Sequence, residues 1–145
     1  MKHAPNSRAF AFPVRVYYED TDAGGVVYYA NYLKFLERCR SEWLRSIGCE
    51  QAGLLRESGI AFVVRSVSLD YLKPARLDDL LTVSLAVEKI TRSQVFFRQH
   101  IRRDGEDGET LASGAIQVVC ARLVPEPIRI VSIPAAMRAQ LEAIQ

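Results

Sequence analysis

The stretch that decides the fold, residues 16–32, reads Val-Tyr-Tyr-Glu-Asp-Thr-Asp-Ala-Gly-Gly-Val-Val-Tyr-Tyr-Ala-Asn-Tyr. It places a carboxylate, Asp22, between a predicted strand and the pair Gly24-Gly25, and an amphipathic helix begins a few residues later. A carboxylate beside a helix N-terminus can attack or deprotonate a substrate while free backbone N–H groups hold a developing oxyanion. The segment is therefore a candidate for acyl-transfer chemistry.

The residues around this segment predict an α+β layout with one antiparallel sheet and one long central helix. The helix is expected from Asn31, as its N-cap, to Ile47, because apolar side chains recur there at spacings of three and four. A shorter helix is expected over residues 50–57. The predicted strands are Val14–Tyr18, Ala61–Leu72, Leu81–Thr91, Gln94–Arg103 and Glu109–Val124, followed by a terminal helix over Ala135–Ile144.

Length and composition predict a single domain over residues 14–145, preceded by a flexible arm over residues 1–13. The 145 residues are 49% hydrophobic and 25% charged, as in ordinary globular proteins. A net charge of +2 gives no argument for nucleic acid, and no apolar run is long enough for a membrane span. Without a secretory signal pattern at the start, we expect a cytoplasmic protein.

The three cysteines, at positions 39, 49 and 120, lack Cys-x-x-Cys spacing, which favours reduced thiols. Only His3 and His100 are available as imidazole ligands, so we expect no metal site, and no cofactor is predicted. One helix covers only one face of a sheet and leaves its edge strands open. This favours a homo-oligomer, which we expect to be a dimer of dimers.

The order of elements resembles the hotdog fold, in which a curved antiparallel sheet wraps around a central helix. Within that fold the chain resembles the 4-hydroxybenzoyl-CoA thioesterase family, and most of all its Tol–Pal-associated acyl-CoA thioesterase branch. The residues that carry the resemblance are Val14–Tyr28, Asn31-Tyr32-Leu33, Phe35-x-Glu37-Arg38, Asp70–Ala75, Asp78-Asp79, Thr91-Arg92-Ser93 and Ile133-Pro134.

The resemblance implies hydrolysis of acyl-CoA thioesters to free acid and CoA, with Asp22 as nucleophile or general base. It also implies that Tyr18 is an active-site tyrosine and that the backbone N–H of Tyr29 polarises the thioester carbonyl. Arg92 and Ser93 lie where the family contacts CoA phosphates, often from a neighbouring subunit. We expect the acyl pocket to be lined by the long helix and residues 60–72.

Two alternatives stand beside this interpretation. In the first, Asp22 has only a structural role, since Asp often caps a turn before glycines. Asp20 is likewise expected to be structural and to accept hydrogen bonds from local N–H groups. Many members of the branch have histidine at the position of Tyr29, an exchange that keeps the backbone N–H and removes an imidazole. That exchange motivates a second hypothesis, a catalytically weak protein that binds acyl carrier protein or an envelope complex.

Overall fold

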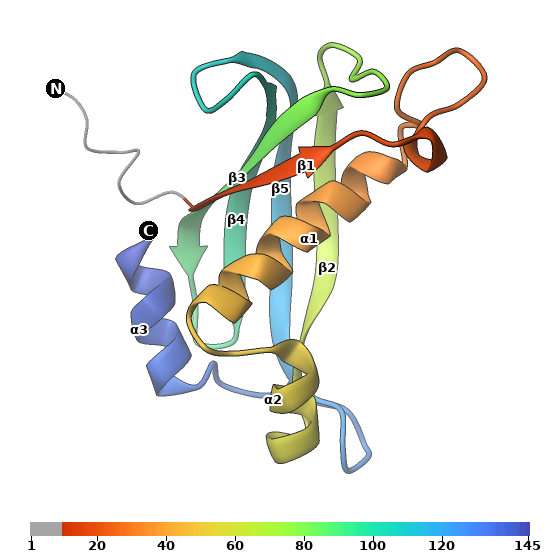
Figure 1. Ribbon diagram of the computed structural model, residues 1–145. Coiled ribbons are helices and arrows are strands. Elements are labelled where there is room, and N and C mark those ends of the chain that lie inside the picture. The colour runs from red at the N-terminus through yellow and green to blue at the C-terminus, as the bar shows by residue number, and fades with distance from the viewer. Residues whose placement is uncertain (1–9) are drawn as a thin grey trace, which may run out of the picture.

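The computed structural model describes residues 10–145, and its elements follow the predicted α+β order (Figure 1). The helices are α1 (Asn31–Ser46), α2 (Gln51–Ser58) and α3 (Ala135–Ala143), with a short 3₁₀ helix, η2 (Tyr18–Asp20). The strands are β1 (Phe10–Arg15), β2 (Ile60–Tyr71), β3 (Leu80–Ile90), β4 (Gln94–Arg103), β5 (Glu109–Arg122) and β6 (Arg129–Ile130).

The strands form one antiparallel sheet in the order β1-β3-β4-β5-β2, and β6 pairs with the end of β5. The β4–β5 hairpin turns at Asp104 and Gly105, both with positive φ, as the Asp-Gly signals predict. Register shifts between Val64 and Ser66 in β2 and between Val87 and Lys89 in β3 mark bulges. Bulges bend strands and increase twist, so they help the sheet curve around α1.

Helix α1 lies across one face of this sheet (Figure 1). Its apolar stripe, which includes Phe35, Leu36, Cys39 and Trp43, is buried against alternate residues of β3, β4 and β5. Gly114 on β5 lies under the helix, where an added Cβ would be 3.4 Å from Leu36 Cδ1. The close approach of α1 to the sheet thus depends on a small residue at the point of contact.

The first strand, predicted from Val14, begins at Phe10, within the stretch that was expected to be an arm. Residues 1–9 lie outside the described part of the chain. Pro13 lies within β1, which is an edge strand, where the missing N–H of proline is tolerated. At the other end of the chain, the prolines at 125 and 127 do not end the sheet, since β6 pairs with Ala121 and Arg122.

Strand β2 is a long edge strand with much exposed surface. Its side chains include Val63, Val64 and Val67, which are each about two-fifths exposed. An open edge of this length offers a row of backbone groups to another strand. Within the described residues, no helix has the length and apolarity needed to cross a membrane.

Candidate active site

Asp22 lies in an exposed loop between η2 and α1, and one of its carboxylate oxygens caps that loop. The N–H of Gly24 donates to Oδ1 at 2.8 Å, and the N–H of Gly25 donates to the Asp22 carbonyl at 3.0 Å. Gly25 has φ of +79°, which suits glycine. The turn-capping interpretation is therefore correct for Oδ1, while no described residue donates a hydrogen bond to Oδ2.

Asp20, two residues earlier, is buried and structural, as predicted. Its Oδ1 accepts a hydrogen bond from Asn31 Nδ2 and its Oδ2 from the N–H of Tyr17, both at 2.9 Å. The expected N-cap role of Asn31 is wrong: Ala30 precedes the helix and makes no side-chain cap, and the Asn31 amide binds Asp20 instead. This pair fixes the loop to the start of α1.

The N-terminal end of α1 leaves two backbone donors open. Asn31 and Tyr32 donate to the carbonyls of Tyr28 and Tyr29, but no described residue accepts a hydrogen bond from the N–H of Tyr29 or of Ala30. Unpaired N–H groups at a helix start carry partial positive charge. They are suited to hold an oxyanion, and Asp22 lies in the same short segment.

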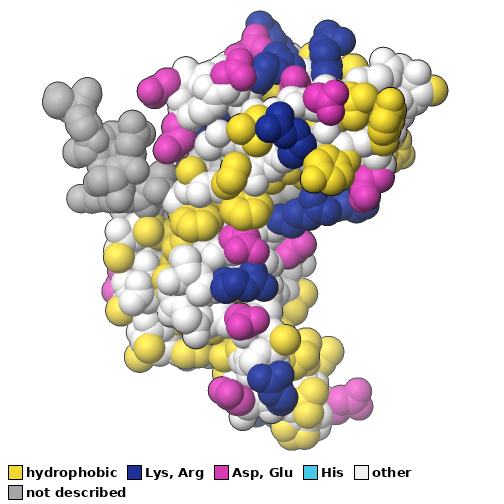
Figure 2. Space-filling view, in the orientation of Figure 1, with side chains coloured by type: hydrophobic (Ala, Val, Ile, Leu, Met, Phe, Trp, Pro, Cys, Tyr) yellow, Lys and Arg dark blue, Asp and Glu magenta, His cyan; other side chains and the backbone are white. Residues whose placement is uncertain are grey.

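Tyrosines surround this segment. Tyr18 and Tyr29 are 82% and 62% exposed, so neither side chain is held in the core. Tyr71 on β2 contributes a contact that the sequence analysis missed: its hydroxyl donates to the Tyr29 carbonyl at 2.9 Å. Its ring also contacts those of Tyr29 and Tyr32 in edge-to-face geometry. Figure 2 shows hydrophobic side chains over this loop, and both charged side chains of either sign and further hydrophobic ones over the rest of the visible face.

A second loop, residues 73–79, holds the Asp22 loop in place. The N–H of Val27 donates to the Ala75 carbonyl at 2.8 Å, and the N–H of Ala75 donates to the Tyr32 hydroxyl at 3.0 Å. Arg103 secures this loop from β4, since it binds Asp79 at 3.1 Å and the Pro74 carbonyl at 2.6 Å. The position of Asp22 therefore depends on residues far away in the sequence.

Arg92 and Ser93 are not brought near Asp22 within one chain. They lie in the hairpin between β3 and β4, at the end of β3 opposite Leu80, where the Asp22 loop is found (Figure 1). The eleven residues of β3 separate these two ends by roughly 35 Å. Arg92 is exposed and donates to Ser132 Oγ at 3.0 Å, whereas Ser93 is buried.

Two of the thiols are part of the packing. Cys39 is fully buried on α1, and burial raises the pKa of its thiol to about 12. Burial likewise raises the pKa of Cys120 to about 11. Such thiols are not nucleophiles near neutral pH. Among residues 10–145, no three His, Cys, Asp or Glu side chains gather where they could hold a metal ion.

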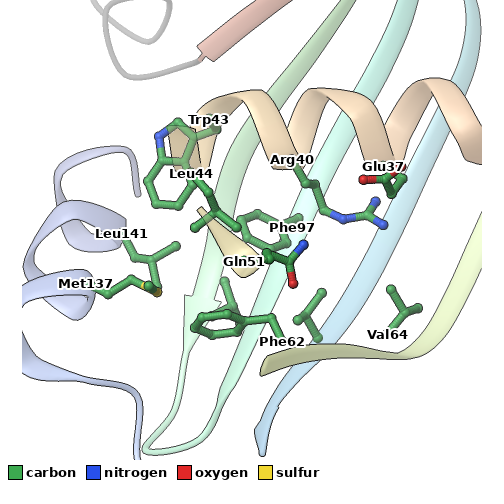
Figure 3. A pocket seen from close by; sticks show the side chains of 12 residues that line it. Glu37, Arg40, Trp43, Leu44, Gln51, Phe62, Val64, Phe97, Met137 and Leu141 are labelled. Carbon is green, nitrogen blue, oxygen red and sulfur yellow. The ribbon is translucent and has the colours of Figure 1, made fainter. Parts of the chain in front are cut away.

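A cavity of about 130 Å³ lies between the helices and the sheet (Figure 3). Trp43 and Leu44 of α1 line it together with Phe62 and Val64 of β2, so a pocket does lie between the two predicted walls. None of the lining residues belongs to the segment 21–30, and the cavity is therefore separate from Asp22.

Comparison with protein families gives a match to the thioesterase superfamily over residues 24–110. Among curated proteins, the acyl-CoA thioesterase YbgC of Haemophilus influenzae is 46% identical over 114 residues, which cover 79% of this chain and 82% of that protein. The acyl-CoA thioester hydrolase YbgC of Escherichia coli O157:H7 is 44% identical over 115 residues, with coverage of 79% and 84%.

Among solved structures, a hypothetical protein from Aquifex aeolicus is similar with a TM-score of 0.81 and 28% identity, over 91% of this chain and 98% of that one. A mutant 4-hydroxybenzoyl CoA thioesterase, complexed with 4-hydroxybenzoyl CoA, has a TM-score of 0.82 at 21% identity, over 95% and 99% of the two chains. The second likeness concerns the fold alone, and it confirms the predicted hotdog architecture.

Proposed function

The chain belongs to the thioesterase superfamily, and on that premise we propose that it hydrolyses acyl-CoA thioesters beside the N-terminal end of α1. The proposal rests on three groups within residues 22–30, namely one carboxylate oxygen and two backbone N–H groups. None of the three has a hydrogen-bond partner among the described residues. A carboxylate and oriented donors are the two elements that attack on an acyl group needs. Relatives that are more than 40% identical and named as acyl-CoA thioesterases support the same reaction.

A thioester carbonyl has weak resonance stabilisation and a good thiolate leaving group. Asp22 Oδ2 either attacks this carbon to form a mixed anhydride or takes a proton from an attacking water. Either way, negative charge develops on the carbonyl oxygen, where the N–H of Tyr29 donates a hydrogen bond. Loss of one such donor typically slows an enzyme about 100-fold or more. Tyr18, beside this site in sequence and exposed, contacts the substrate.

The active unit is a homo-oligomer, a dimer of dimers, in which a neighbouring copy supplies the CoA contacts. Two features support this assembly. The exposed edge strand β2 offers a pairing surface, and Arg92 and Ser93 lie at the opposite end of the sheet from Asp22 in the same chain. With the neighbouring copy in place, the exposed guanidinium of Arg92 binds CoA phosphate, for which its geometry is suited.

The test is hydrolysis of a panel of short, long and aromatic acyl-CoAs by the purified protein. Turnover of at least one acyl-CoA above the rate in buffer supports the proposal. Absence of turnover with every member would instead favour the alternative, a binding protein for acyl carrier protein or an envelope complex. A cytoplasmic location stays a prediction, and fractionation of cells that express the tagged chain tests it.

Single-turnover hydrolysis in oxygen-18 water separates the two chemical routes. If Asp22 is the nucleophile, CoA leaves as the thiolate and one water then hydrolyses the mixed anhydride; attack of that water at the carboxyl carbon of Asp22 puts label into Asp22, and label in Asp22 therefore identifies the anhydride route. If Asp22 is a general base, label appears in the released acid alone. Mass spectrometry of the peptide that contains Asp22 distinguishes these outcomes.

A further inference from the structure

The cavity between the helices and the sheet combines an apolar interior with one cation (Figure 3). Its walls come from α1, α2, α3, β2, β4 and β5. The apolar lining residues are Trp43, Leu44, Phe62, Val64, Val95, Phe97, Val118, Met137 and Leu141. The polar ones are Glu37, Arg40 and Gln51. An apolar pocket with few polar groups is the usual form of a small-molecule site.

A polar residue of the sheet, Gln99, holds Arg40 in place through a hydrogen bond. Gln99 on β4 is fully buried, and its Oε1 accepts a hydrogen bond from Arg40 Nη1 at 2.9 Å. The Nε2 of Gln99 donates to the Leu36 carbonyl at 3.1 Å, which fixes the direction of the amide. Apolar side chains otherwise fill this face of β4, so the glutamine is a specific support for the guanidinium.

The guanidinium has five N–H donors, of which only one has an acceptor among the described residues. No carboxylate of these residues forms an ion pair with it. Glu37 also lines the cavity, but its Oε2 accepts from Ser41 instead. Burial lowers the pKa of Arg40, against the opposing effect of the nearby Glu37 carboxylate, which forms no close ion pair with the guanidinium.

We propose that this cavity binds a free fatty acid, with the carboxylate on Arg40 and the hydrocarbon chain among the apolar side chains that extend to α3. A carboxylate matches the open N–H groups of a guanidinium and forms the close ion pair that Glu37 does not form with Arg40. In Figure 3 the guanidinium lies at the end of the cavity away from Met137 and Leu141. The chain of the ligand therefore runs from Arg40 toward α3.

Within one chain, this site is separate from the hydrolytic segment. Arg40 follows Asn31 by nine residues, about 14 Å along α1, and no residue of the segment 21–30 lines the cavity. A free acid is the class of product that the proposed hydrolysis releases. Its binding nevertheless requires no turnover, so the inference is tested without the reaction.

Trp43 gives a direct readout, because it is the single tryptophan of the chain and it lines the cavity. We expect titration with decanoate, below its micelle concentration, to change the intrinsic fluorescence saturably. Decanol has the same chain and no charge, and we expect it to bind at least about tenfold more weakly. No saturable change with decanoate, or equal affinities for the two ligands, would overturn the proposal.

Substitution of the cation supplies the matched comparison. Arg40→Leu is expected to weaken decanoate binding about tenfold or more while decanol binds as before, which also shows that the cavity is still folded. Arg45→Leu, an exposed arginine of the same helix that pairs with Glu42 and does not line the cavity, is the control and keeps both affinities. Unchanged decanoate affinity in Arg40→Leu would contradict the proposal. If that variant does not fold, the comparison of decanoate with decanol in the unmodified chain decides between the outcomes.

A competition experiment distinguishes a free acid from the acyl chain of a substrate. In Asp22→Asn, chosen to slow turnover, decanoate is titrated with and without saturating decanoyl-CoA. Unchanged decanoate binding supports a separate fatty-acid site. Displacement by decanoyl-CoA, but not by CoA, would assign the cavity to the substrate chain and overturn the proposal. Failure of hydrolysis in the acyl-CoA panel would leave these binding results unaffected, so the two proposals fail independently.

Discussion

Asp20 and Asp22 differ by two positions in the chain and are in opposite environments. Asp20 is buried and both its carboxylate oxygens accept hydrogen bonds, while Asp22 is exposed and has one oxygen without a described partner. The carboxylate of Asp20 has a structural role, since both of its oxygens already accept hydrogen bonds. Only the second has an oxygen available for a substrate, and this contrast is the basis for assigning the chemistry to Asp22.

We predict that Asp20→Ala destabilises the protein by about 2–3 kcal/mol, because it leaves the buried Asn31 amide and the partly buried Tyr17 N–H without acceptors. Urea denaturation measures the free energy of unfolding. Asp22→Asn is the matched control, and it should change that free energy by less than about 0.5 kcal/mol because it lies on the surface. A loss in Asp20→Ala no larger than in the control would show that the Asp20 contacts are unimportant.

At the residue scale, the sequence predicts Asp22, Tyr18 and Tyr29 as neighbours because they lie in one short motif. It does not predict the partner of Asn31, because capping rules describe preferences within a helix, and here the buried Asp20 competes for the amide. Tyr71 was missed as a support for Tyr29 because 42 residues separate the two. Only the pairing of β2 across the sheet brings that hydroxyl to the helix start.

At the scale of elements, the loop 73–79 positions the Asp22 loop, and Arg103 positions the loop 73–79. The guanidinium contacts Asp79 at 3.1 Å, Glu109 at 2.7 Å and the Pro74 carbonyl, and it is only 24% exposed. Charge-assisted hydrogen bonds at such partly buried sites are stronger than surface ion pairs. Arg103 is therefore a positioning residue for Asp22 and the Tyr29 amide.

We predict that Arg103→Leu lowers the free energy of unfolding by roughly 1–3 kcal/mol and lowers kcat more than it raises KM. The reason for the kinetic split is that a displaced loop misaligns Asp22 without removing substrate contacts. Arg102→Leu, the adjacent arginine on the opposite face of β4, serves as control. Equal kinetic effects in the two variants would contradict the positioning role.

The elements themselves are largely predictable from the sequence. Alternating apolar residues and Asp-Gly turns locate β4 and the β4–β5 hairpin, and the stripe from Tyr32 to Trp43 locates α1. The errors lie at β1, which begins at Phe10 instead of the predicted Val14, and at β6, because the prolines at 125 and 127 were taken to end the sheet. The edge position of β1 tolerates Pro13, and edge positions follow from topology, which local pattern does not contain.

At the scale of the whole molecule, the open edge of β2 is the surface through which we propose that copies of the chain pair in the active unit. We predict that Val67→Lys, a charge on this edge, gives a smaller species in sedimentation velocity and a parallel loss of acyl-CoA hydrolysis. Val124→Lys, at an exposed valine beyond β5, should keep both properties. A Val67→Lys protein that sediments unchanged would contradict pairing through β2.

The stability of the molecule should fall in mild acid because of His100. Burial lowers its pKa below 6.5, and the neighbouring Arg102 and Arg98 lower it further against the opposing effect of Glu88. The unfolded chain then binds a proton that the folded chain resists, so stability is lost as the pH falls through about 6.5. Denaturant unfolding at about pH 7.5 and about pH 5.5 measures this loss. His100→Gln should reduce it, and an identical loss in that variant would assign the effect to other groups.

The central claim is that Asp22 carries out the hydrolysis of acyl-CoA thioesters, and steady-state turnover of Asp22→Asn with the best acyl-CoA tests it most directly. Asparagine keeps an oxygen for the Gly24 N–H, so the loop should hold its shape and the melting temperature should stay unchanged. We predict that kcat falls about 100-fold or more, because the amide neither attacks nor accepts a proton. Turnover close to that of the unmodified chain would contradict the account.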